Sequence, residues 1–176
     1  MGRDEYAIVL EYLPYGLVDT KDRRPSAIVL TDSLSLLLVS LKKDVVVESG
    51  KRVYIGEEKR DEIHHIIKRI APDKLSESGL QNLKNMVHKA AQDNEKKYVE
   101  ILNTLGPINV RLHALELIPG LGKKMTQKMI EERQKKPFES YADIDARLQL
   151  ASGISHGIEQ RILEEISETD KYRIFT

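Results

Sequence analysis

The chain has 176 residues, the length of one to one and a half average domains, which argues against a single large enzyme core. Its 28 basic and 28 acidic side chains cancel, and a net charge of zero argues against a histone-like protein that coats polyanions. The absence of cysteine excludes disulfides, thiolate metal sites and cysteine nucleophiles. Residues 34–41 form the longest apolar run, well short of the roughly 20 residues of a membrane span. Because the N-terminus also shows no signal-peptide pattern, we expect a cytoplasmic protein without membrane contact.

Short apolar segments at the front of the chain predict β-structure. Side chains alternate between two faces from Glu5 to Leu13, as in a strand with one buried face. Further short segments follow at residues 26–31, 34–41, 45–47 and 52–55, each bounded by polar turns. Five strands at this spacing, with no helical pattern between them, predict a small barrel or a strongly bent sheet rather than βαβ units.

The spacing of apolar residues changes after Gly56. Four isoleucines at 63, 66, 67 and 70 follow helical spacing, and Pro72 is expected to end that helix. A second helical segment is predicted over residues 80–102, with a polar stretch, QDNEKK at 92–97, that can break it. From residue 109 to 166 the pattern predicts short helices with tight connections and no strand.

The segment LELIPGLGKKMTQKMIEER, residues 115–133, is the most informative part of the sequence. Pro119 has no N–H and cannot continue the first short helix. Gly120 and Gly122 permit positive φ and the close approach of another backbone, and a second helix starts directly after them. The N–H groups at the start of that helix lack partners and have a partial positive charge, so a phosphate oxygen can satisfy them.

Lys123 and Lys124 occupy the first turn of this second helix, where negative side chains are preferred. Two lysines at that end are explained if an external anion binds there. The alternative, that both are ordinary solvated surface lysines, is equally compatible with their position.

This segment resembles the helix-hairpin-helix motif, an element that binds nucleic acid without sequence specificity. The matching residues are Ile118, Pro119, Gly120, Leu121, Gly122 and Ile130, with Thr126 at the position where the motif has a small residue. Residues 137–144 resemble the connecting segment of a tandem pair, with Ser140 and Asp143 forming an N-cap box. A degenerate second hairpin follows at residues 152–155, with Ser155 in place of its second glycine and Glu159 at its small position.

Charge is unevenly distributed around this motif. Residues 111–136 have seven basic and three acidic side chains, a net charge of +4. Residues 137–176 have four basic and eight acidic side chains, a net charge of −4. The positive end of the C-terminal third therefore coincides with the first hairpin.

The front segment offers a second candidate surface. In residues 52–55, Arg52 and Tyr54 face the same way, and an aromatic beside an arginine can stack on a base of single-stranded RNA. Alternatively, Tyr54 packs on the following helix. With its barrel-like front, RVYIG at 52–56, LIPGLGKK at 117–124 and PFES at 137–140, the chain resembles an uncharacterised archaeal family described as nucleic-acid-binding.

That resemblance implies an α+β protein in three parts. These are a small OB-like β-barrel over residues 1–56, a helical connector over 57–108 and an all-α tandem helix-hairpin-helix domain over 109–176. The family description, which joins an OB-like or S1-like barrel to a helix-hairpin-helix region, implies binding and no known reaction.

The hypothesis is a non-enzymatic protein that binds the RNA or DNA backbone. A protein-interaction adaptor with structural hairpins is the alternative, and a nuclease or repair accessory enzyme is a weaker one, with Asp143 and Asp145 as its only candidate carboxylates. No metal-binding histidine motif or cofactor fingerprint is present, so no cofactor is predicted. The candidate binding residues are Gly120, Leu121, Gly122, Lys123, Lys124 and Lys128 in the first hairpin, Gly153 and Ser155 in the second, and Arg52 and Tyr54 in the front.

Overall fold

The computed structural model describes residues 4–176 and divides into two compact units. Unit 1 contains the described residues up to 86, together with 166–168 and 176. Unit 2 contains residues 87–165 and 169–175. The division falls inside helix α1 (Glu77–Asp93), so the boundaries expected at residues 56 and 108 do not coincide with it.

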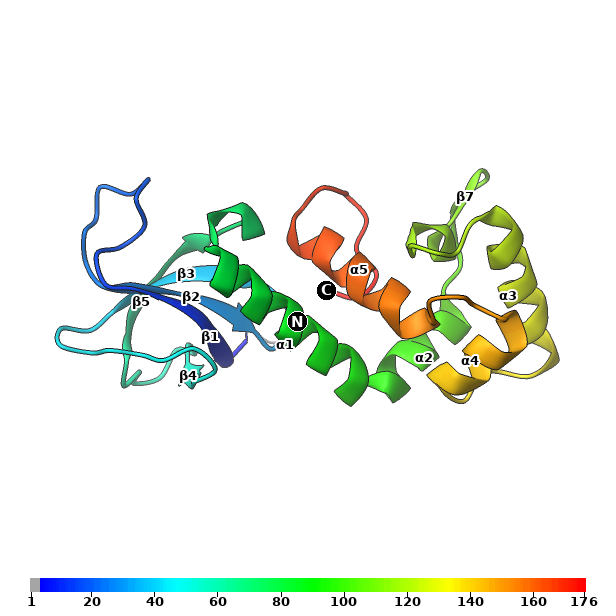
Figure 1. Cartoon of the computed structure of the whole chain (residues 1–176), viewed down its shortest axis with the longest axis horizontal. Helices are drawn as coiled ribbons and strands as arrows, with labels where there is room; N and C mark the ends of the chain where they lie inside the picture. Colours follow the sequence, from blue (N-terminus) through cyan, green and yellow to red (C-terminus); the bar gives the residue numbers. More distant parts are fainter. Residues whose placement is uncertain (1–3) are drawn as a thin grey trace. The chain divides into compact units, whose positions relative to one another are not determined.

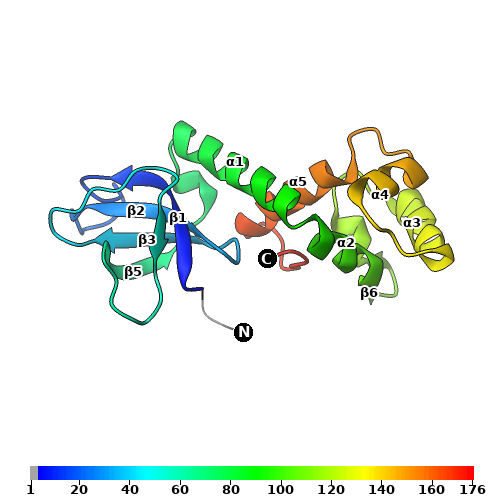
Figure 2. The same ribbon diagram turned by 90° about the horizontal axis from the view of Figure 1, so that it is seen from below.

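Unit 1 is built on a curled antiparallel sheet, a half-barrel, shown in Figures 1 and 2. Its strands are β1 (Tyr6–Leu13), β2 (Ser26–Thr31), β3 (Leu36–Leu41), β4 (Arg52–Tyr54) and β5 (Ile63–Arg69), in the order β4-β1-β2-β3-β5. Register shifts in the β1–β2 and β3–β5 ladders increase the local bend. The strands expected at residues 5–13, 26–31, 34–41 and 52–55 are confirmed as β1 to β4.

Two predictions for this unit are wrong. Residues 45–47 form no strand, and the helix expected from Ile63 to Ile70 is instead strand β5, paired with β3. The β3–β5 ladder contains two register shifts, which break the simple alternation of faces that marks a strand in the sequence. Ile63 is fully buried while Ile66 is 38% exposed, so the isoleucines do not share the single buried face that a helix would give them.

Both faces of the half-barrel are apolar. The inner face contains Ala7, Val9, Ala27, Val29, Val39, Leu41, Val47, Val53, Ile55 and Ile63. Residues of the other face are also buried, among them Leu10, Ile28, Leu30, Leu36 and Leu38. The 3₁₀ turn η1 (Pro72–Lys74) leads into α1, whose first half is fixed to β1. The Asn82 side-chain amide donates to the Leu10 carbonyl at 2.9 Å, and the Ser76 N–H donates to the Glu11 carboxylate at 2.9 Å.

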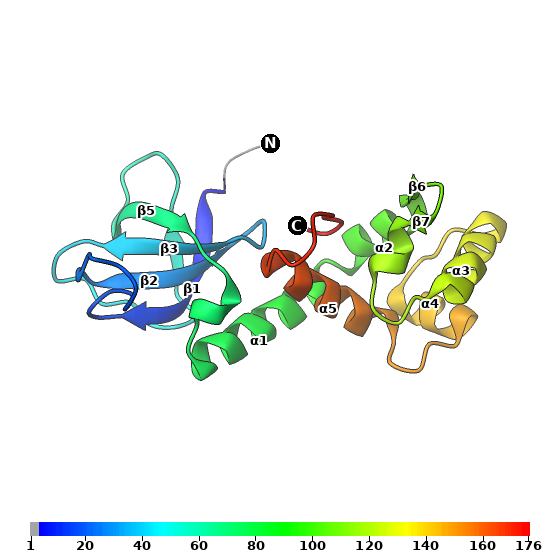
Figure 3. The ribbon, with the colours of Figure 1, turned by 90° about the horizontal axis from the view of Figure 1, so that it is seen from above.

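Unit 2 is mainly helical (Figures 1 and 3). Its elements after α1 are α2 (Glu95–Thr104), β6 (Pro107–Asn109), β7 (Leu112–His113), the 3₁₀ turn η2 (Ala114–Leu117), α3 (Lys123–Lys135), α4 (Tyr141–Leu148) and α5 (Ile154–Ile166). The polar stretch at 92–97 does interrupt the predicted helix, since α1 and α2 separate at Asn94. The expectation of no strand after residue 109 is wrong, because β6 and β7 pair as a small hairpin.

The connection between α3 and α4 follows the local prediction. Ser140 is the N-cap of α4, and its hydroxyl accepts from the Asp143 N–H at 3.0 Å. One face of this segment is buried in the core of unit 2, through Phe138, Tyr141, Ile144 and Leu148. Met129 of α3 and Ile158 of α5 are fully buried in the same unit.

No helix in the described part of the chain is long and apolar enough to cross a bilayer. Nor do residues 4–176 bring together three or more histidine or carboxylate side chains in a group able to hold a metal ion.

Candidate nucleic-acid interface

The turn between η2 and α3, residues 119–122, is exposed and conformationally special at one position. Gly120 has φ of +92°, a left-handed conformation that residues with a side chain rarely adopt. Leu121 points inward and is 2% exposed, and its N–H donates to the Ile118 carbonyl at 3.0 Å. Leu121 therefore anchors the turn while Pro119, Gly120 and Gly122 face solvent.

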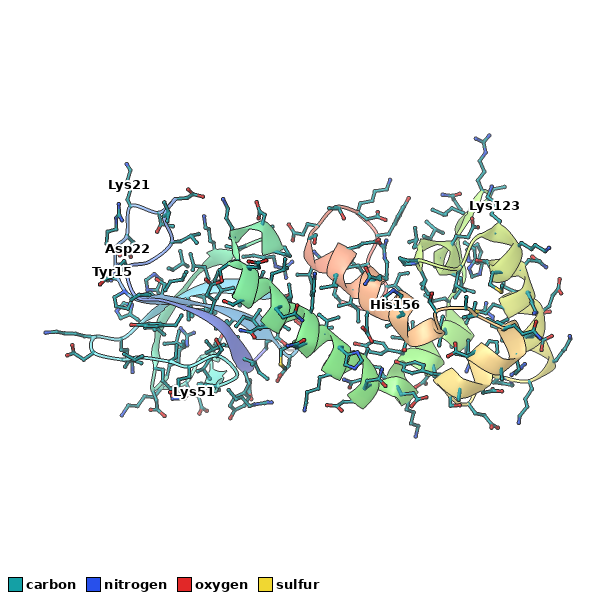
Figure 4. The ribbon with its side chains drawn as sticks, viewed as in Figure 1. Tyr15, Lys21, Asp22, Lys51, Lys123 and His156 are labelled. Atoms are coloured by element: carbon teal, nitrogen blue, oxygen red, sulfur yellow. The ribbon has the colours of Figure 1, made fainter. Side chains whose placement is uncertain are left out.

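The N-terminus of α3 has no internal cap among the described residues. Gly122 is the N-cap, no side chain bonds to this helix end, and its first turn contains no acidic residue. The Thr126 N–H donates to the Gly122 carbonyl at 2.8 Å, so the N–H groups that precede it have no helical carbonyl to bond. Lys123 and Lys124 are exposed beside these groups, and Figure 4 shows Lys123 at this end of α3.

The glycines near the turn differ in how much space surrounds them. Packing requires glycine at some of these positions and not at others. A Cβ at Gly120 or Gly122 would meet nothing within 4 Å, and Gly122 has an ordinary φ of −71°. By contrast, a Cβ at Gly157 in α5 would lie 2.6 Å from the Pro119 carbonyl oxygen. Gly157 is thus needed for α5 to approach the turn, whereas no contact or backbone angle within the described chain requires glycine at 122.

The second hairpin has the opposite arrangement. Gly153 is left-handed, with φ of +76°, and α5 begins at the next residue. The Asp145 carboxylate accepts from the Ile154 N–H at 2.7 Å, so an internal anion already occupies this helix end. Ser155 lies in the first turn of α5 and is partly buried. That the second hairpin is a degenerate copy of the first stays a prediction.

The two hairpin turns lie side by side around a cavity of about 310 Å³. Pro119, Gly120 and Leu121 line one side of it. The residues from the second hairpin and α5 are Leu150, Ala151, Ser152, Gly153, Ile154, His156, Gly157 and Gln160. Figure 4 marks His156 on α5 near this region. The structure therefore brings together the predicted residues Gly120, Leu121 and Gly153.

Several basic residues near the first hairpin are engaged within the protein. Arg133 donates to the Leu102 and Leu105 carbonyls at 2.7 and 2.6 Å, and Lys135 pairs with Glu132 at 2.6 Å. Lys136 pairs with Glu139 at 2.9 Å, and Lys128 donates to the Leu148 carbonyl at 3.4 Å. Among the described residues, the side chains of Arg111, Lys123 and Lys124 have no such partner. Lys128 thus has a structural contact that its sequence position did not indicate.

A second cavity, of about 340 Å³, adjoins the start of α3 on the side of the β6–β7 hairpin. Arg111, Lys123, His113 and Thr126 are among the residues that line it. Thr126 is 3% exposed, and its hydroxyl has no hydrogen-bond partner in the described part of the chain. Thr126 is the residue at the position where the motif has a small side chain. Its buried hydroxyl oxygen is left without a hydrogen bond within the described chain.

His113 fixes the first element of the hairpin. The imidazole Nδ1 of His113 accepts from the Leu115 backbone N–H at 3.1 Å. The backbone N–H of His113 donates to the Glu116 carboxylate at 3.1 Å. Burial, and secondly the charge of Arg133, lower the pKa of the His113 imidazole, although Glu116 opposes this. His113 is therefore held neutral, as an Nδ1 acceptor requires. The pattern His-x-x-Glu could have indicated this capping box in the sequence.

Arg52 and Tyr54, the predicted front surface, lie in unit 1 and are also engaged. Arg52 pairs with Asp32 at 3.2 Å and lies 4.6 Å from the centre of the Tyr6 ring. Tyr54 packs edge-on against Tyr6 at 5.3 Å, and its hydroxyl accepts from the Glu58 N–H at 3.3 Å. The alternative that Tyr54 packs on a following helix is wrong, because an irregular segment and β5 follow β4.

Asp143 and Asp145, the carboxylates considered for an enzyme, both have structural partners. Asp143 accepts from the Glu139 N–H at 3.1 Å and from Arg147 at 3.3 Å. Asp145 caps α5, a role that nothing in the local sequence signalled because the two residues in the bond are nine positions apart. Gly157 was likewise missed, since its need for glycine arises from a contact with a distant segment.

The fold and this site define an α+β protein that combines a curled antiparallel half-barrel with a mainly helical unit containing two adjoining turns. The chain belongs to the family of proteins of unknown function DUF655, whose model matches residues 3–176. It is 39% identical to the uncharacterized protein MJ0038 of Methanocaldococcus jannaschii over 175 residues, 98% of this chain and 79% of that protein. The crystal structure of Af1531 from Archaeoglobus fulgidus, of the same family, is 38% identical, with a TM-score of 0.81 over 98% of this chain and 99% of that one.

Proposed function

We propose that this protein binds nucleic acid without catalysis, holding backbone phosphates through the turn and first helical residues at 120–124. The observation that carries the proposal is the start of α3, where unbonded N–H groups, two exposed lysines and an unobstructed Gly122 coincide. An external phosphate would satisfy the N–H groups, the helix dipole and the lysine charges together. Because every contact is with the backbone, the proposed binding has no sequence specificity.

Within this proposal the first hairpin is the helix-hairpin-helix element and the second completes its packing. The Asp145 carboxylate at the start of α5 would repel a phosphate, which supports binding through the first turn alone. Few phosphates would be neutralised, and two to four contacts correspond to a slope of roughly −2 to −4 in log K against log salt.

The half-barrel has the strand order of a five-stranded OB-like barrel that is left open between β4 and β5. The sequence also predicts a surface for single-stranded RNA on this half-barrel, formed by Arg52 and Tyr54. Arg52 and Tyr54 are the groups that would stack on a base. Arg52 forms an ion pair with Asp32, and the Tyr54 ring packs against Tyr6. These contacts favour a proposal restricted to the first hairpin of unit 2.

The test compares two pairs of lysines, each in the first turn of a helix of unit 2. In Lys123→Glu/Lys124→Glu the glutamates suit the helix N-terminus, so α3 is retained while phosphate is repelled. Lys96→Glu/Lys97→Glu, at the exposed start of α2, makes the same change in net charge away from the turn. Fluorescence anisotropy with RNA and DNA oligomers measures the affinity of each.

We expect the hairpin pair to lose about tenfold or more in affinity, roughly 1.4 kcal/mol or more. The α2 pair should lose much less. Equal losses in the two variants would attribute binding to net charge alone, and no loss in the hairpin pair would refute the proposed site.

A further inference from the structure

The open mouth of the half-barrel in unit 1 forms a groove of about 820 Å³. It lies where β4 and β5, the two ends of the strand order, leave the barrel unclosed. The end of β4, the segment after it, the β2–β3 turn and β5 all contribute to its walls. This groove is separate from the hairpin site, since its lining residues all belong to unit 1.

The floor of the groove is apolar and partly exposed. Leu37 and Ile55 belong to the inner face of the half-barrel, and Ile66 beside them is 38% exposed. An exposed isoleucine next to a continuous apolar core provides a place where one or two apolar side chains of a ligand can be buried.

The rim of the groove is predominantly acidic. Its charged residues are Asp4, Glu5, Glu57, Glu58, Arg60 and Arg69. Arg69 is paired with Glu168 at 3.4 Å and also donates to Ser35 at 2.8 Å, so its charge is compensated within the protein. The resulting negative field would repel a nucleic-acid backbone and attract a cationic ligand.

Within residues 4–176, strands β4 and β5 each have one edge without a strand partner. On β4, the Ile55 N–H donates to the Glu5 carbonyl and Lys51 bonds to Val9, so these residues face β1. By the alternation of an antiparallel ladder, the backbone groups of Arg52 and Tyr54 face the open edge. An extended chain can add to such an edge through main-chain hydrogen bonds.

We infer that this groove binds an extended segment of a partner polypeptide in which basic and apolar residues alternate. The segment adds along the open strand edge, its apolar side chains cover Leu37 and Ile66, and its basic side chains reach the carboxylates of the rim. Alternation follows from strand geometry, because successive side chains point to opposite faces. This protein-binding site does not depend on the hairpin and gives the chain a second, independent ligand.

A labelled peptide of alternating lysine and valine serves as the probe in a binding titration. Two further peptides separate the components of recognition. Alternating glutamate and valine keeps the strand tendency but reverses the charge, whereas the lysine–valine peptide methylated on every backbone nitrogen keeps the charge but cannot donate main-chain hydrogen bonds to the edge. We expect binding of the lysine–valine peptide to exceed that of either other peptide by about tenfold or more.

The protein variants test the rim. Glu5→Lys/Glu58→Lys reverses two exposed rim charges, and Glu48→Lys/Asp73→Lys makes the same change at exposed positions outside the groove. The rim variant should lose about tenfold in affinity for the lysine–valine peptide and the control far less. Hydrogen exchange gives a second measurement that needs no substitution, since bound peptide should protect amides in residues 52–58 or 66–69 of the wild-type protein.

Four results would overturn the inference. The first is equal binding of the three peptides, and the second is binding of the lysine–valine peptide that both double variants weaken equally. The third is bound peptide that protects no edge amide. The fourth is tighter binding of a poly-uridine oligomer that the rim substitutions alter, which would assign the groove to nucleic acid. Lys123→Glu/Lys124→Glu should leave peptide binding unchanged, so failure here and failure of the hairpin site are distinguishable.

Discussion

Helices α3 and α5 begin after similar turns, and both turns line the same cavity, yet the two helix N-termini have opposite surroundings. The start of α5 is closed by the Asp145 carboxylate, which accepts from the Ile154 N–H at 2.7 Å. The start of α3 has two exposed lysines and no side-chain cap from the part of the chain that the structure describes. One helix end thus has a side-chain acceptor within the chain, while the N–H groups at the other are left to solvent or to a ligand. Two similar turns can therefore share a packing role while only one of them leaves its helix N-terminus open.

The contrast extends to the charges along each helix. The Arg161 and Glu165 side chains of α5 are 2% and 0% exposed and are bonded to each other at 3.1 Å. Glu165 also accepts from the Ile174 and Phe175 N–H groups at 2.8 and 3.1 Å, and Arg161 donates to the Tyr172 carbonyl at 2.6 Å. The Tyr172 N–H and then Arg161 lower the pKa of the Asp170 carboxyl. Charge on α5 fixes the C-terminal segment, whereas charge at the start of α3 faces solvent.

The largest effect should come from breaking the internal network of α5. Glu165→Ala leaves Arg161 buried and removes the acceptor of two backbone N–H groups, which should cost about 3–5 kcal/mol in the free energy of unfolding. Glu164→Ala is the matched control, because Glu164 contacts the same arginine at 3.4 Å but is 46% exposed. It should cost less than about 1 kcal/mol, as exposed pairs do. Urea unfolding measures both, and similar costs would show that burial of the pair does not hold the segment.

A single substitution gives the start of α3 the kind of carboxylate that the start of α5 already has. Gly122→Asp places a carboxylate at an N-cap with open space and ordinary backbone angles. The substitution should raise the free energy of unfolding by a few tenths of a kcal/mol, because aspartate caps better than glycine. It should also lower nucleic-acid affinity by about tenfold or more, since it fills and repels at the phosphate position.

Gly106→Asp is the control for that experiment. Gly106 also has open space around it and lies in the same unit, and the substitution adds the same charge away from the turn. It should change affinity little. A Gly122→Asp protein that is stable and still binds as tightly as the wild type would separate the hairpin from binding.

Features that depend on neighbours in sequence were predictable, and those that depend on distant segments were not. The Ser140 cap of α4 and the break between α1 and α2 follow from a few adjacent residues, and both predictions are confirmed. The first four strands were readable from their spacing. Asp145, Gly157 and the partners of Lys128 depend on segments brought together by folding, so no local pattern signalled them. The proposed phosphate contacts at residues 120–124 stay a prediction.

The misassigned strand β5 shows a different limit. Its isoleucines have helical spacing, but the strand is bulged, so alternation cannot be recognised along it. Isoleucine also favours strands intrinsically, and this preference opposes the helical spacing of the four isoleucines. The outcome is decided by the unpaired edge of β3, which needs a partner strand, and only the rest of the sheet supplies that information.

The smallest expected effect concerns the element before the turn and is a pH dependence. The Leu115 N–H requires an unprotonated Nδ1 on His113, and burial lowers the pKa of this imidazole in the folded protein. The unfolded chain therefore takes up a proton first, below about pH 6.5, so the stabilisation from this cap is full above that pH and is lost as the pH falls. His113→Asn supplies an acceptor that does not titrate.

Urea unfolding at about pH 7.5 and about pH 5.5 should therefore show a loss of stability that is roughly 0.5–1 kcal/mol smaller in His113→Asn than in the wild type. His156→Asn, an exposed histidine of the same unit, controls for the removal of an imidazole as such and should keep the wild-type pH dependence. An identical pH dependence in all three proteins would mean that the η2 cap tolerates protonation. The turn that presents Gly120 to Lys124 would then be held by Leu121 rather than by the cap before it, because Leu121 is the buried anchor that remains.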